Sequence, residues 1–319
     1  MSGSVKELIK IDPQKETEKI ISKLKNDMTK VLKKRGAVVG ISGGIDSSVV
    51  LALCAKAFGP NKVIGIMLPE KESSKDNFIL ARSLCQTYGV KYIIEDITGA
   101  LEGFGCYRRR DEAIKRVFPD FDNSYKAKII LPDKLLDKET LNVFSVKIIS
   151  PEGKETSLRL PVKEYLEIVA ASNFKQRSRM SMLYFHADAR NFAVIGTGNK
   201  NEHEQGFFVK YGDGAADAKP IAHLFKTQVF QLAEYLNIPE EIRKRTPTTD
   251  TYSAEQTQEE FFFRVPFETL DKIWIGWEQG VPSDKIANDL KLSAQQVDNV
   301  INDIQRKISS TEYLRREPL

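Results

Sequence analysis

The stretch 37–51, AVVGISGGIDSSVVL, constrains this chain more than any other part of it. Residues 37–41 form a short apolar run rich in β-branched side chains, which is typical of a strand buried in a parallel sheet. Gly43 and Gly44 follow, and adjacent glycines accept positive φ and let backbone N–H groups approach an anion closely. A helix then opens near Ile45. The pattern predicts a phosphate site built from a strand, an amide-rich loop and the positive end of a helix.

Asp46 adds a second element to this site. A carboxylate beside bound phosphates repels them unless Mg²⁺ lies between, so we interpret Asp46 as a metal ligand. The motif is not a Walker A loop, because no Gly-Lys-Ser/Thr follows the glycines, and it is not GxGxxG. The structural alternative is a glycine-rich strand-to-helix turn in which Asp46 only caps the helix.

Size and charge exclude several classes of protein. The 319 residues can bury a large core in one domain or two, and 41% hydrophobic with 29% charged residues is ordinary for a soluble globular enzyme. The net charge of +4 is too small to argue for a nucleic-acid-binding protein. We therefore expect no nucleic-acid partner.

The cysteines and the apolar runs bear on the compartment. Cys54, Cys85 and Cys106 form no CxxC pair and are odd in number, so neither a disulfide framework nor a zinc site is indicated. No signal-peptide pattern opens the chain and no 18 apolar residues run together. These features predict a cytoplasmic protein without a membrane partner.

Helices and strands are predicted to alternate in the first hundred residues. Such alternation favours an α/β fold with a parallel, doubly wound sheet and helices on both faces. The predicted elements are a helix at 14–33, strands at 37–41, 62–67 and 91–96, and helices after Ile45 and from 73 to 88.

This alternation stops between residues 98 and 173. Two strand-like runs, 143–149 and 156–162, flank a turn at Pro151 to Lys154 and predict a β-hairpin insertion. Three arginines at 108–110 are interpreted either as solvated surface or as a phosphate contact.

The α/β pattern returns with a helix at 176–191 and a strand at 192–196. The segment 196–202, GTGNKNE, follows at the carboxyl end of that strand, where open α/β sheets place their ligands. A glycine-bearing segment at 210–217 leads to Lys226 and a helix at 227–236. The last third is predicted to be helical, and the absence of a basic face at 281–308 argues against a DNA-binding helix-turn-helix.

These segments together carry a family resemblance. The loop 42–47 resembles the SGGxDS loop of the N-type ATP pyrophosphatases, which cleave ATP between the α and β phosphates. With 196–202 and 210–217, about two thirds of the chain resembles the ammonia-dependent NAD synthetases. The resemblance implies an adenine-nucleotide α-hydrolase-like fold in one domain, 1–319, with an insertion at about 99–161 and a helical C-terminal segment at about 251–319.

The resemblance also implies a reaction. Family members use ATP to adenylate the nicotinate carboxylate of deamido-NAD, and ammonia then displaces AMP to give NAD. Charge on the phosphates calls for Mg²⁺, backbone amides and lysines rather than a nucleophilic side chain. The resemblance further implies a homodimer, with nitrogen supplied as free ammonia or by a separate glutaminase.

Site residues follow from the resemblance position by position. It assigns Asp46 and Glu202 to Mg²⁺, with Asp46 and Lys226 as the catalytic pair. Taken singly, Glu202 is as readily a helix-start carboxylate, Lys226 a solvated lysine and Asp217 a turn former. The ATP contacts are Gly40, Ile41, Ser42, Gly43, Gly44, Ile45, Ser47, Thr197, Lys226 and Thr248, and the dinucleotide contacts are Arg177, Lys210 and Asp217.

Three features depart from the family pattern, all on the side of the acceptor acid. The insertion is longer than the family connection, the acidic family segment reads EQTQEEFFF at 255–263, and no His-Lys pair stands near the C-terminus. Phe261, Phe262 and Phe263 are either core residues or an altered pocket wall. Three hypotheses follow: an NAD synthetase, a related ligase acting on another carboxylate, and a catalytically silent nucleotide-binding protein.

Overall fold

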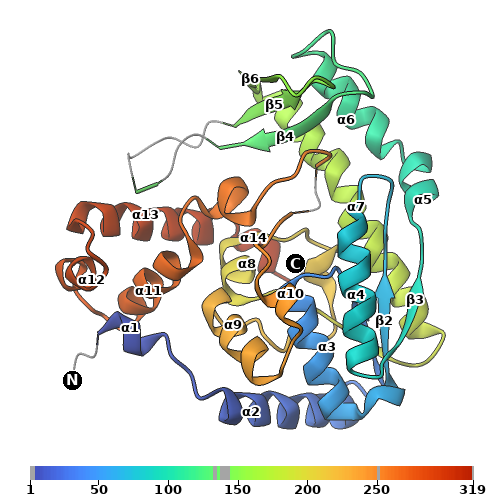
Figure 1. Ribbon diagram of the computed structural model, residues 1–319, viewed down its shortest axis with the longest axis vertical. Helices are drawn as coiled ribbons and strands as arrows, with labels where there is room; N and C mark the ends of the chain where they lie inside the picture. Colours follow the sequence, from blue (N-terminus) through green and yellow to red (C-terminus); the bar gives the residue numbers. More distant parts are fainter. Residues whose placement is uncertain (1–3, 132–134, 137–143, 250–251, 318–319) are drawn as a thin grey trace. The chain divides into compact units, whose positions relative to one another are not determined.

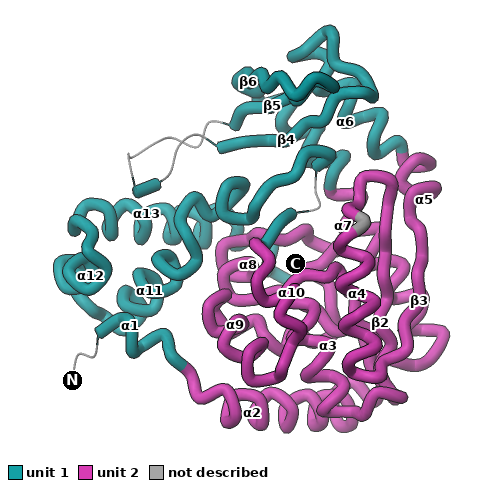
Figure 2. The backbone as a smooth tube through the Cα atoms, viewed as in Figure 1, with its two compact units in different colours: residues 1–10, 105–172, 247–319 teal, residues 11–104, 173–246 magenta. Residues whose placement is uncertain are grey.

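The computed structural model describes residues 4–131, 135–136, 144–249 and 252–317. The chain divides into two compact units, coloured separately in Figure 2. Unit 1 comprises residues 1–10, 105–172 and 247–319, and unit 2 comprises residues 11–104 and 173–246. One domain with an insertion and a C-terminal segment stays a prediction.

Unit 2 is built on a four-stranded parallel sheet with the order β3-β2-β1-β7. The strand β1 lies inside the sheet, where Ala37 pairs with Val63 on one side and with Ala193 on the other. All carboxyl ends therefore meet at one edge. The predicted strands are confirmed with slightly shorter bounds: β1 (Ala37–Gly40), β2 (Val63–Met67), β3 (Lys91–Ile94) and β7 (Ala193–Ile195).

Both faces of this sheet are covered. Ala37 and Val39 belong to a core cluster with α3 (Ile45–Phe58), whereas Val38 packs in a second cluster with α7 (Val162–Asp188). Alternate residues of a strand point to opposite faces, so helices on both sides bury all three side chains. The predicted doubly wound α/β fold is confirmed.

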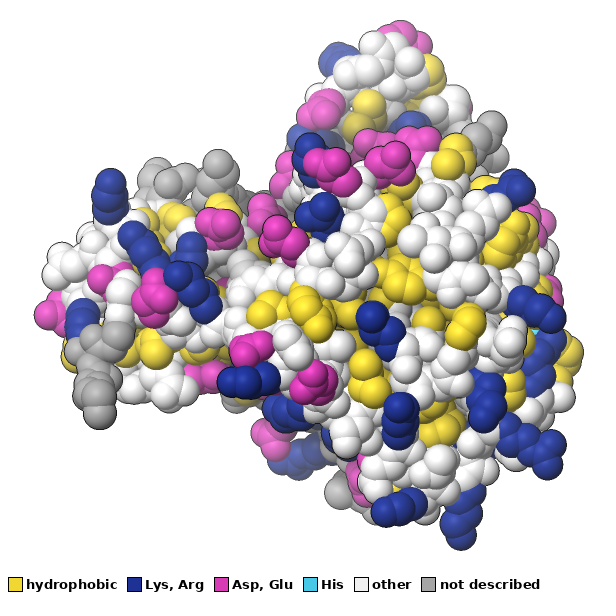
Figure 3. Space-filling model, turned by 60° about the horizontal axis from the view of Figure 1, so that its bottom comes forward, with side chains coloured by type: hydrophobic (Ala, Val, Ile, Leu, Met, Phe, Trp, Pro, Cys, Tyr) yellow, Lys and Arg dark blue, Asp and Glu magenta, His cyan; other side chains and the backbone are white. Residues whose placement is uncertain are grey.

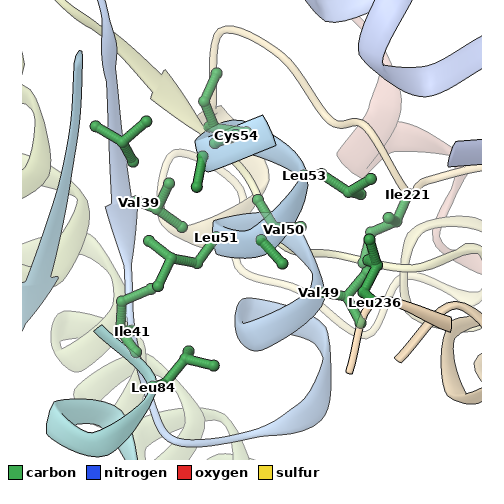
Figure 4. Close-up of a cluster of buried hydrophobic side chains, with 14 of the residues drawn as sticks. Val39, Ile41, Val49, Val50, Leu51, Leu53, Cys54, Leu84, Ile221 and Leu236 are labelled. Atoms are coloured by element: carbon green, nitrogen blue, oxygen red, sulfur yellow. The ribbon is translucent and has the colours of Figure 1, made fainter. Parts of the chain in front are cut away.

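The helix α3 is apolar on almost every side because it is surrounded. It packs against α2, α4 and α9 as well as the sheet. Figure 4 shows the core around it, with Val39 and Ile41 near β1, Leu84 from α4, and Ile221 and Leu236 from the later part of the unit. Burial of this kind stabilises a helix far more than its intrinsic propensity does.

The remaining helices of unit 2 surround this core. In Figure 1, α3 and α4 lie in front of the sheet. Asp12 caps α2 by accepting a hydrogen bond from the Lys15 backbone N–H at 3.1 Å, and Pro13 is the first helical residue. The elements are α2 (Pro13–Asn26), the π-helical turn η1 (Asp27–Val31), the 3-10 turn η2 (Pro60–Lys62), α4 (Lys75–Thr87), α5 (Thr98–Gly103), α8 (Lys200–Gln205), the 3-10 turn η3 (Asp213–Ala215), α9 (Lys226–Tyr235) and α10 (Glu240–Arg243).

Unit 1 contains an antiparallel sheet in the order β4-β5-β6. The predicted hairpin is confirmed as β5 (Ser145–Ile149) and β6 (Glu155–Arg159), with Gly153 at φ 83° in the turn. Val143, the first residue of the predicted run, lies outside the described residues. A third strand, β4 (Lys126–Ile130), was not predicted.

The helix α7 begins earlier than predicted. The sequence places its start at Gln176 and ends a strand at Val162, but Val162 is the first residue of α7. Pro161 precedes it, and its carbonyl accepts the Tyr165 N–H at 3.0 Å. Proline cannot continue a ladder but suits a helix start, so the strand ends there and the helix begins.

The predicted helical C-terminal part is confirmed for the described residues. Trp274 and Val5 are fully buried, and a Cβ at Gly276 would lie 2.8 Å from a Val5 methyl carbon, so α1 packs closely on α11. Phe263 is 1% exposed and its ring contacts that of Phe267 at a tilted angle, as expected of a core residue. The helices of unit 1 are α1 (Val5–Leu8), α6 (Cys106–Lys115), the π-helical turn η4 (Glu259–Phe263), α11 (Phe267–Glu278), α12 (Ser283–Leu290), α13 (Ala294–Ser310) and α14 (Glu312–Arg315).

Most charged residues lie at the surface, and Arg110 is an exception. On the face in Figure 3, Lys and Arg side chains lie in several small groups, and Asp and Glu side chains lie beside some of them. Arg110 differs, because it is 6% exposed and pairs with Asp111 at 2.8 Å, so it is not the solvated residue that one sequence interpretation assumed. Within the described residues, every helix is too short or too polar to cross a bilayer.

Candidate active site

The loop after β1 is held by hydrogen bonds within one short turn. Gly44 is the N-cap of α3, and its carbonyl accepts hydrogen bonds from the Ser47 and Ser48 hydroxyls at 3.0 and 2.8 Å. Its N–H donates to the Ser42 hydroxyl at 3.3 Å. The loop therefore lies at the positive end of α3, where anions are favoured.

Gly43 fixes the shape of this loop. Its φ is 78°, and a Cβ placed there would lie 2.5 Å from the Asn77 carbonyl oxygen in the first turn of α4. A Cβ at Gly40 would lie 3.2 Å from a leucine of α7. Ile41 and Ile45 bury their side chains in the core, so only their backbones are available to a ligand.

The strand β7 brings a second helix start to the same edge. It pairs with β1 in parallel, so the segment 196–199 follows β7 beside the glycine loop. Asn199 is fully buried and its Oδ1 accepts the Glu202 N–H at 3.1 Å, while the Glu202 carboxylate accepts the Asn199 N–H at 3.2 Å. This capping box defines the start of α8. Thr197 is half-buried in the same segment.

Asp46 connects three helix starts. Its Oδ1 accepts a hydrogen bond from Asn199 Nδ2 at 3.0 Å, and its Oδ2 accepts one from Lys226 Nζ at 2.5 Å. Lys226 opens α9 and is 1% exposed, and its N–H donates to Asn201 Oδ1 at 2.9 Å. A buried lysine of this kind is retained only where an opposite charge compensates it, so Lys226 is not the solvated lysine of the alternative interpretation.

Glu202 is perturbed by its surroundings. Burial, and next the negative charge of Asp46, raise the pKa of the Glu202 carboxyl to about 8 from an ordinary value of 4.5, against the opposing effect of Lys226. Two carboxylates that repel one another in a buried place are a common feature of functional sites. A cation between them would relieve the repulsion.

The predicted dinucleotide contacts lie on α7 and on the segment after α8. Arg177 Nε donates to the Lys210 carbonyl at 3.3 Å, so the structure brings these two residues together. Asp217 accepts hydrogen bonds from the Tyr184 hydroxyl at 3.0 Å and from the Val194 N–H at 2.8 Å. Asp217 therefore holds the segment 210–217 against α7 and β7.

Thr248 is the one predicted site residue outside unit 2. It belongs to unit 1, where its backbone pairs with that of Thr257. All other predicted site residues belong to unit 2.

Sequence reasoning missed Asn199 and a buried lysine, Lys175. Asn199 stands three residues before Glu202, and that N-x-x-E spacing is a recognisable capping pattern. Lys175 Nζ pairs with Glu70 and Glu72, more than one hundred positions earlier, so no local signal marks it.

The three histidines contact other side chains, and the three cysteines are buried. His186 bonds Glu95 at 3.0 Å, His223 bonds Glu16 at 2.7 Å, and the His203 ring stacks on an aromatic side chain. No group of three or more His, Cys, Asp or Glu among the described residues could hold a metal ion. All three cysteines are buried and form no disulfide, and Cys106 Sγ donates to the Ala171 carbonyl at 3.1 Å.

Comparison with known proteins identifies the family. A family model described as NAD synthase matches residues 16–120 and 132–318. The chain belongs to the NAD synthase family. The resemblance found in the sequence is thereby confirmed.

Named family members include one close in length. The protein of Mesorhizobium japonicum described as an NH(3)-dependent NAD(+) synthetase is 46% identical over 312 residues, which are 98% of this chain and 98% of the relative. The alignment leaves no room for an unmatched insertion of 60 residues, so the long segment 99–161 has a counterpart in that relative.

Solved structures support the same fold. A structure from Francisella tularensis described as NMN synthetase is 24% identical, covers 97% of this chain and 98% of its own, and has a TM-score of 0.67. An NH3-dependent NAD synthetase from Campylobacter jejuni is also 24% identical, with 97% and 99% covered and a TM-score of 0.62.

Proposed function

We propose that this chain catalyses the ATP-dependent amidation of deamido-NAD by ammonia, giving NAD, AMP and pyrophosphate through an acyl-adenylate. The observation that carries the proposal is the joining of Asp46, Lys226 and Asn199 beside the glycine loop, in a chain 46% identical to a named NH(3)-dependent NAD(+) synthetase. The reaction is inferred from family membership, and the residues that act in it are inferred from their contacts.

The loop is suited to grip the triphosphate of ATP. A carboxylate is a poor acyl donor because its leaving group would be oxide, so transfer of AMP to the substrate acid creates a better one. The backbone N–H groups of Gly43 and of the first turn of α3 can face the phosphates, whereas the Ile41 N–H donates to the Ile66 carbonyl at 2.9 Å. No nucleophilic side chain is needed.

Lys226 supplies a fixed positive charge. Its ammonium is buried, held by Asp46 and anchored through its own backbone to Asn201. A preorganised charge in a place with little water stabilises developing negative charge without reorganising during the reaction. In the proposal this charge serves the α phosphate and the departing pyrophosphate.

Asp46 and Glu202 would hold Mg²⁺. The ion usually takes one or two protein carboxylates together with substrate phosphates, and the raised pKa of Glu202 beside Asp46 fits a place that a cation would stabilise. When bound, Mg²⁺ neutralises phosphate charge. Both carboxylates also argue against a catalytically silent protein.

The remaining contacts belong to the same proposal. Thr197 and Thr248 would contact ATP, and Arg177, Lys210 and Asp217 would bind deamido-NAD. The linkage of Arg177 to the Lys210 backbone supports a common task for the two. We also infer a homodimer and a nitrogen supply that is free ammonia or a separate glutaminase. The buried cysteines, which form no disulfide, suit a reducing cytoplasmic compartment.

Product analysis tests this proposal. Incubation with ATP, Mg²⁺, ammonium and deamido-NAD should yield AMP, pyrophosphate and NAD in equal amounts. The Asp46→Asn variant should fold and lose at least about a hundredfold in kcat, since it removes the charge that faces Lys226. Folded wild-type protein that forms neither AMP nor NAD would contradict the proposal.

A second candidate is a related ligase that amidates another carboxylate. The altered segment at 255–263 favours it, because this segment departs from the family pattern on the acceptor side. One fold relative is described as an NMN synthetase, so the corresponding mononucleotide acid is the first substrate to compare. AMP formation that depends on that acid while deamido-NAD stays inert would select this candidate.

A further inference from the structure

A buried ion cluster connects α7 to the chain that follows β2. Lys175 Nζ lies 3.0 Å from Glu70 Oε1 and 2.7 Å from Glu72 Oε2. The side chains of Lys175 and Glu70 are 1% and 0% exposed, and that of Glu72 is 12% exposed. Charges this deeply buried are costly unless they compensate one another, so the three groups of this Lys175 cluster fix each other's positions.

The cluster holds a turn that is itself tightly bonded. The Glu70 N–H donates to Ser73 Oγ at 3.0 Å, and the Ser73 N–H donates back to the Glu70 carbonyl at 2.8 Å. The Glu72 N–H donates to Glu70 Oε2 at 3.1 Å. One Glu70 carboxylate oxygen therefore serves its own turn while the other faces Lys175, which leaves the turn little freedom relative to α7.

This turn leads directly to the glycine loop. The helix α4 begins two residues after Ser73, and its third residue is Asn77. The Asn77 carbonyl oxygen lies where a side chain at Gly43 would stand, 2.5 Å from an ideal Cβ. Closely packed backbone transmits displacement. Movement of the turn 70–73 would therefore move the Asn77 carbonyl, which lies against Gly43.

A second contact from α7 secures the same connection at its other end. Arg179 Nε donates to the Leu68 carbonyl at 3.4 Å. Arg179 follows Lys175 by four residues, so both side chains leave the same face of α7. The helix therefore holds the connection 68–73 at both ends.

We propose that Lys175 is a positioning residue for the phosphate loop. Its ion pairs with Glu70 and Glu72 set the first turn of α4 against Gly43, and thereby set the shape in which the loop receives ATP. The identity of that ligand rests on the proposed function. The positioning itself rests on the contacts above.

Binding of a non-cleavable ATP analogue, measured by calorimetry, tests this role without turnover. Lys175→Met should bind the analogue about tenfold more weakly and raise the KM for ATP by a similar factor, because small displacements at a positioned site are costly. The KM for deamido-NAD should change by less than about twofold. A residue that only stabilises the fold would leave these two KM values in their wild-type ratio.

Lys307→Met is the matched control. Lys307 lies on α13 in unit 1, is buried, and pairs with Asp303 at 2.7 Å, so its replacement also strands a buried carboxylate. We expect a comparable fall in melting temperature with unchanged affinity for the analogue. Equal affinities for the analogue in wild type and Lys175→Met, or an equal loss of affinity in both methionine variants, would overturn the proposal.

A milder variant keeps the test decisive if Lys175→Met does not fold. Glu72→Gln removes the more exposed partner and leaves the pair of Lys175 with Glu70, so affinity for the analogue should fall about threefold. Unchanged affinity in folded Glu72→Gln would overturn the positioning role. Failure of wild-type protein to bind the analogue would instead contradict the proposed function, so the two failures are distinguishable.

Discussion

Asn199 illustrates how one side chain can serve both folding and chemistry. Its side-chain oxygen Oδ1 caps α8 by accepting the Glu202 N–H, and its side-chain nitrogen Nδ2 donates to Asp46 in another helix. The residue is fully buried, so a substitution leaves both partners without a replacement from water. The local cap was readable from the N-x-x-E spacing, but the bond to Asp46 depends on the pairing of β1 with β7.

Replacing Asn199 by alanine should therefore do more than remove a cap. We expect the free energy of unfolding to fall by about 1–3 kcal/mol, together with a loss of kcat, because Asp46 loses a hydrogen bond that orients it. Ser293→Ala is the control, since Ser293 caps α13 through the same kind of capping box. It should cost about 1 kcal/mol and leave kcat unchanged. Urea unfolding and steady-state assays of both variants give the comparison, and equal kcat in the two would contradict this role of Asn199.

The raised pKa of Glu202 predicts that the stability of the protein depends on pH when no divalent metal is present. Its pKa is raised to about 8 in the folded state, so between its ordinary value of 4.5 and about 8 the folded protein keeps a proton that the unfolded chain has lost. The contribution of Glu202 to stability is therefore present below pH 4.5 and is lost as the pH rises through about 8. Urea unfolding in a chelator, from about pH 5 to about pH 9, should show this fall in wild type and a smaller one in Glu202→Gln. Identical stability profiles of wild type and Glu202→Gln would contradict the raised pKa of Glu202.

At the scale of elements, the glycine loop owes its shape to two helices as well as to its own sequence. Gly43 has positive φ, which the two adjacent glycines predict, but its close approach to Asn77 of α4 does not follow from any local pattern. The same limit explains other differences. The strand β4 was missed because its residues become a strand by pairing with β5, and the start of α7 was missed because the strand-like run 156–162 ends at Val162.

Gly43→Ala and Gly59→Ala separate the two demands on glycine. Gly59 has φ 82° with open space around its Cβ position, whereas Gly43 has φ 78° and faces the Asn77 carbonyl. Gly59→Ala should lower the free energy of unfolding by about 1–3 kcal/mol through backbone strain alone, because its ψ of 148° adds to the strain of positive φ. Gly43→Ala should cost about 1–3 kcal/mol more, because the backbone must shift, and it should weaken ATP binding. Chemical unfolding measures the loss of stability, and calorimetry measures the binding of ATP. Equal losses of stability in the two variants would show that contact with Asn77 does not constrain the loop.

At the scale of the molecule, the sequence predicted the unit that holds the loop better than it predicted the other unit. The parallel sheet of unit 2 follows from its alternating elements, and the family resemblance implied that Asp46 and Lys226 act together. The Lys175 cluster joins residues 103 and 105 positions apart, and such pairings arise only when the fold is complete. Long-range contacts between charged residues leave no periodic trace in a sequence.

The proposed homodimer is a prediction at this scale. Closed twofold assemblies are the commonest among soluble oligomers, and the family resemblance implies one here. Sedimentation equilibrium should give about twice the chain mass of 36.1 kDa. A single-chain mass at micromolar concentration, with full activity, would contradict the dimer while leaving the chemistry of the loop intact.

In the proposed reaction, the substrate carboxylate captures AMP at the loop that begins at Ser42. Deamido-NAD labelled with ¹⁸O in its nicotinate carboxylate tests it directly. Mass spectrometry of the products should find one labelled oxygen in the phosphate of AMP for each NAD formed, because the carboxylate oxygen bridges to phosphorus in the acyl-adenylate and leaves with AMP. Unlabelled AMP, or ADP in its place, would rule out transfer of AMP to the substrate carboxylate.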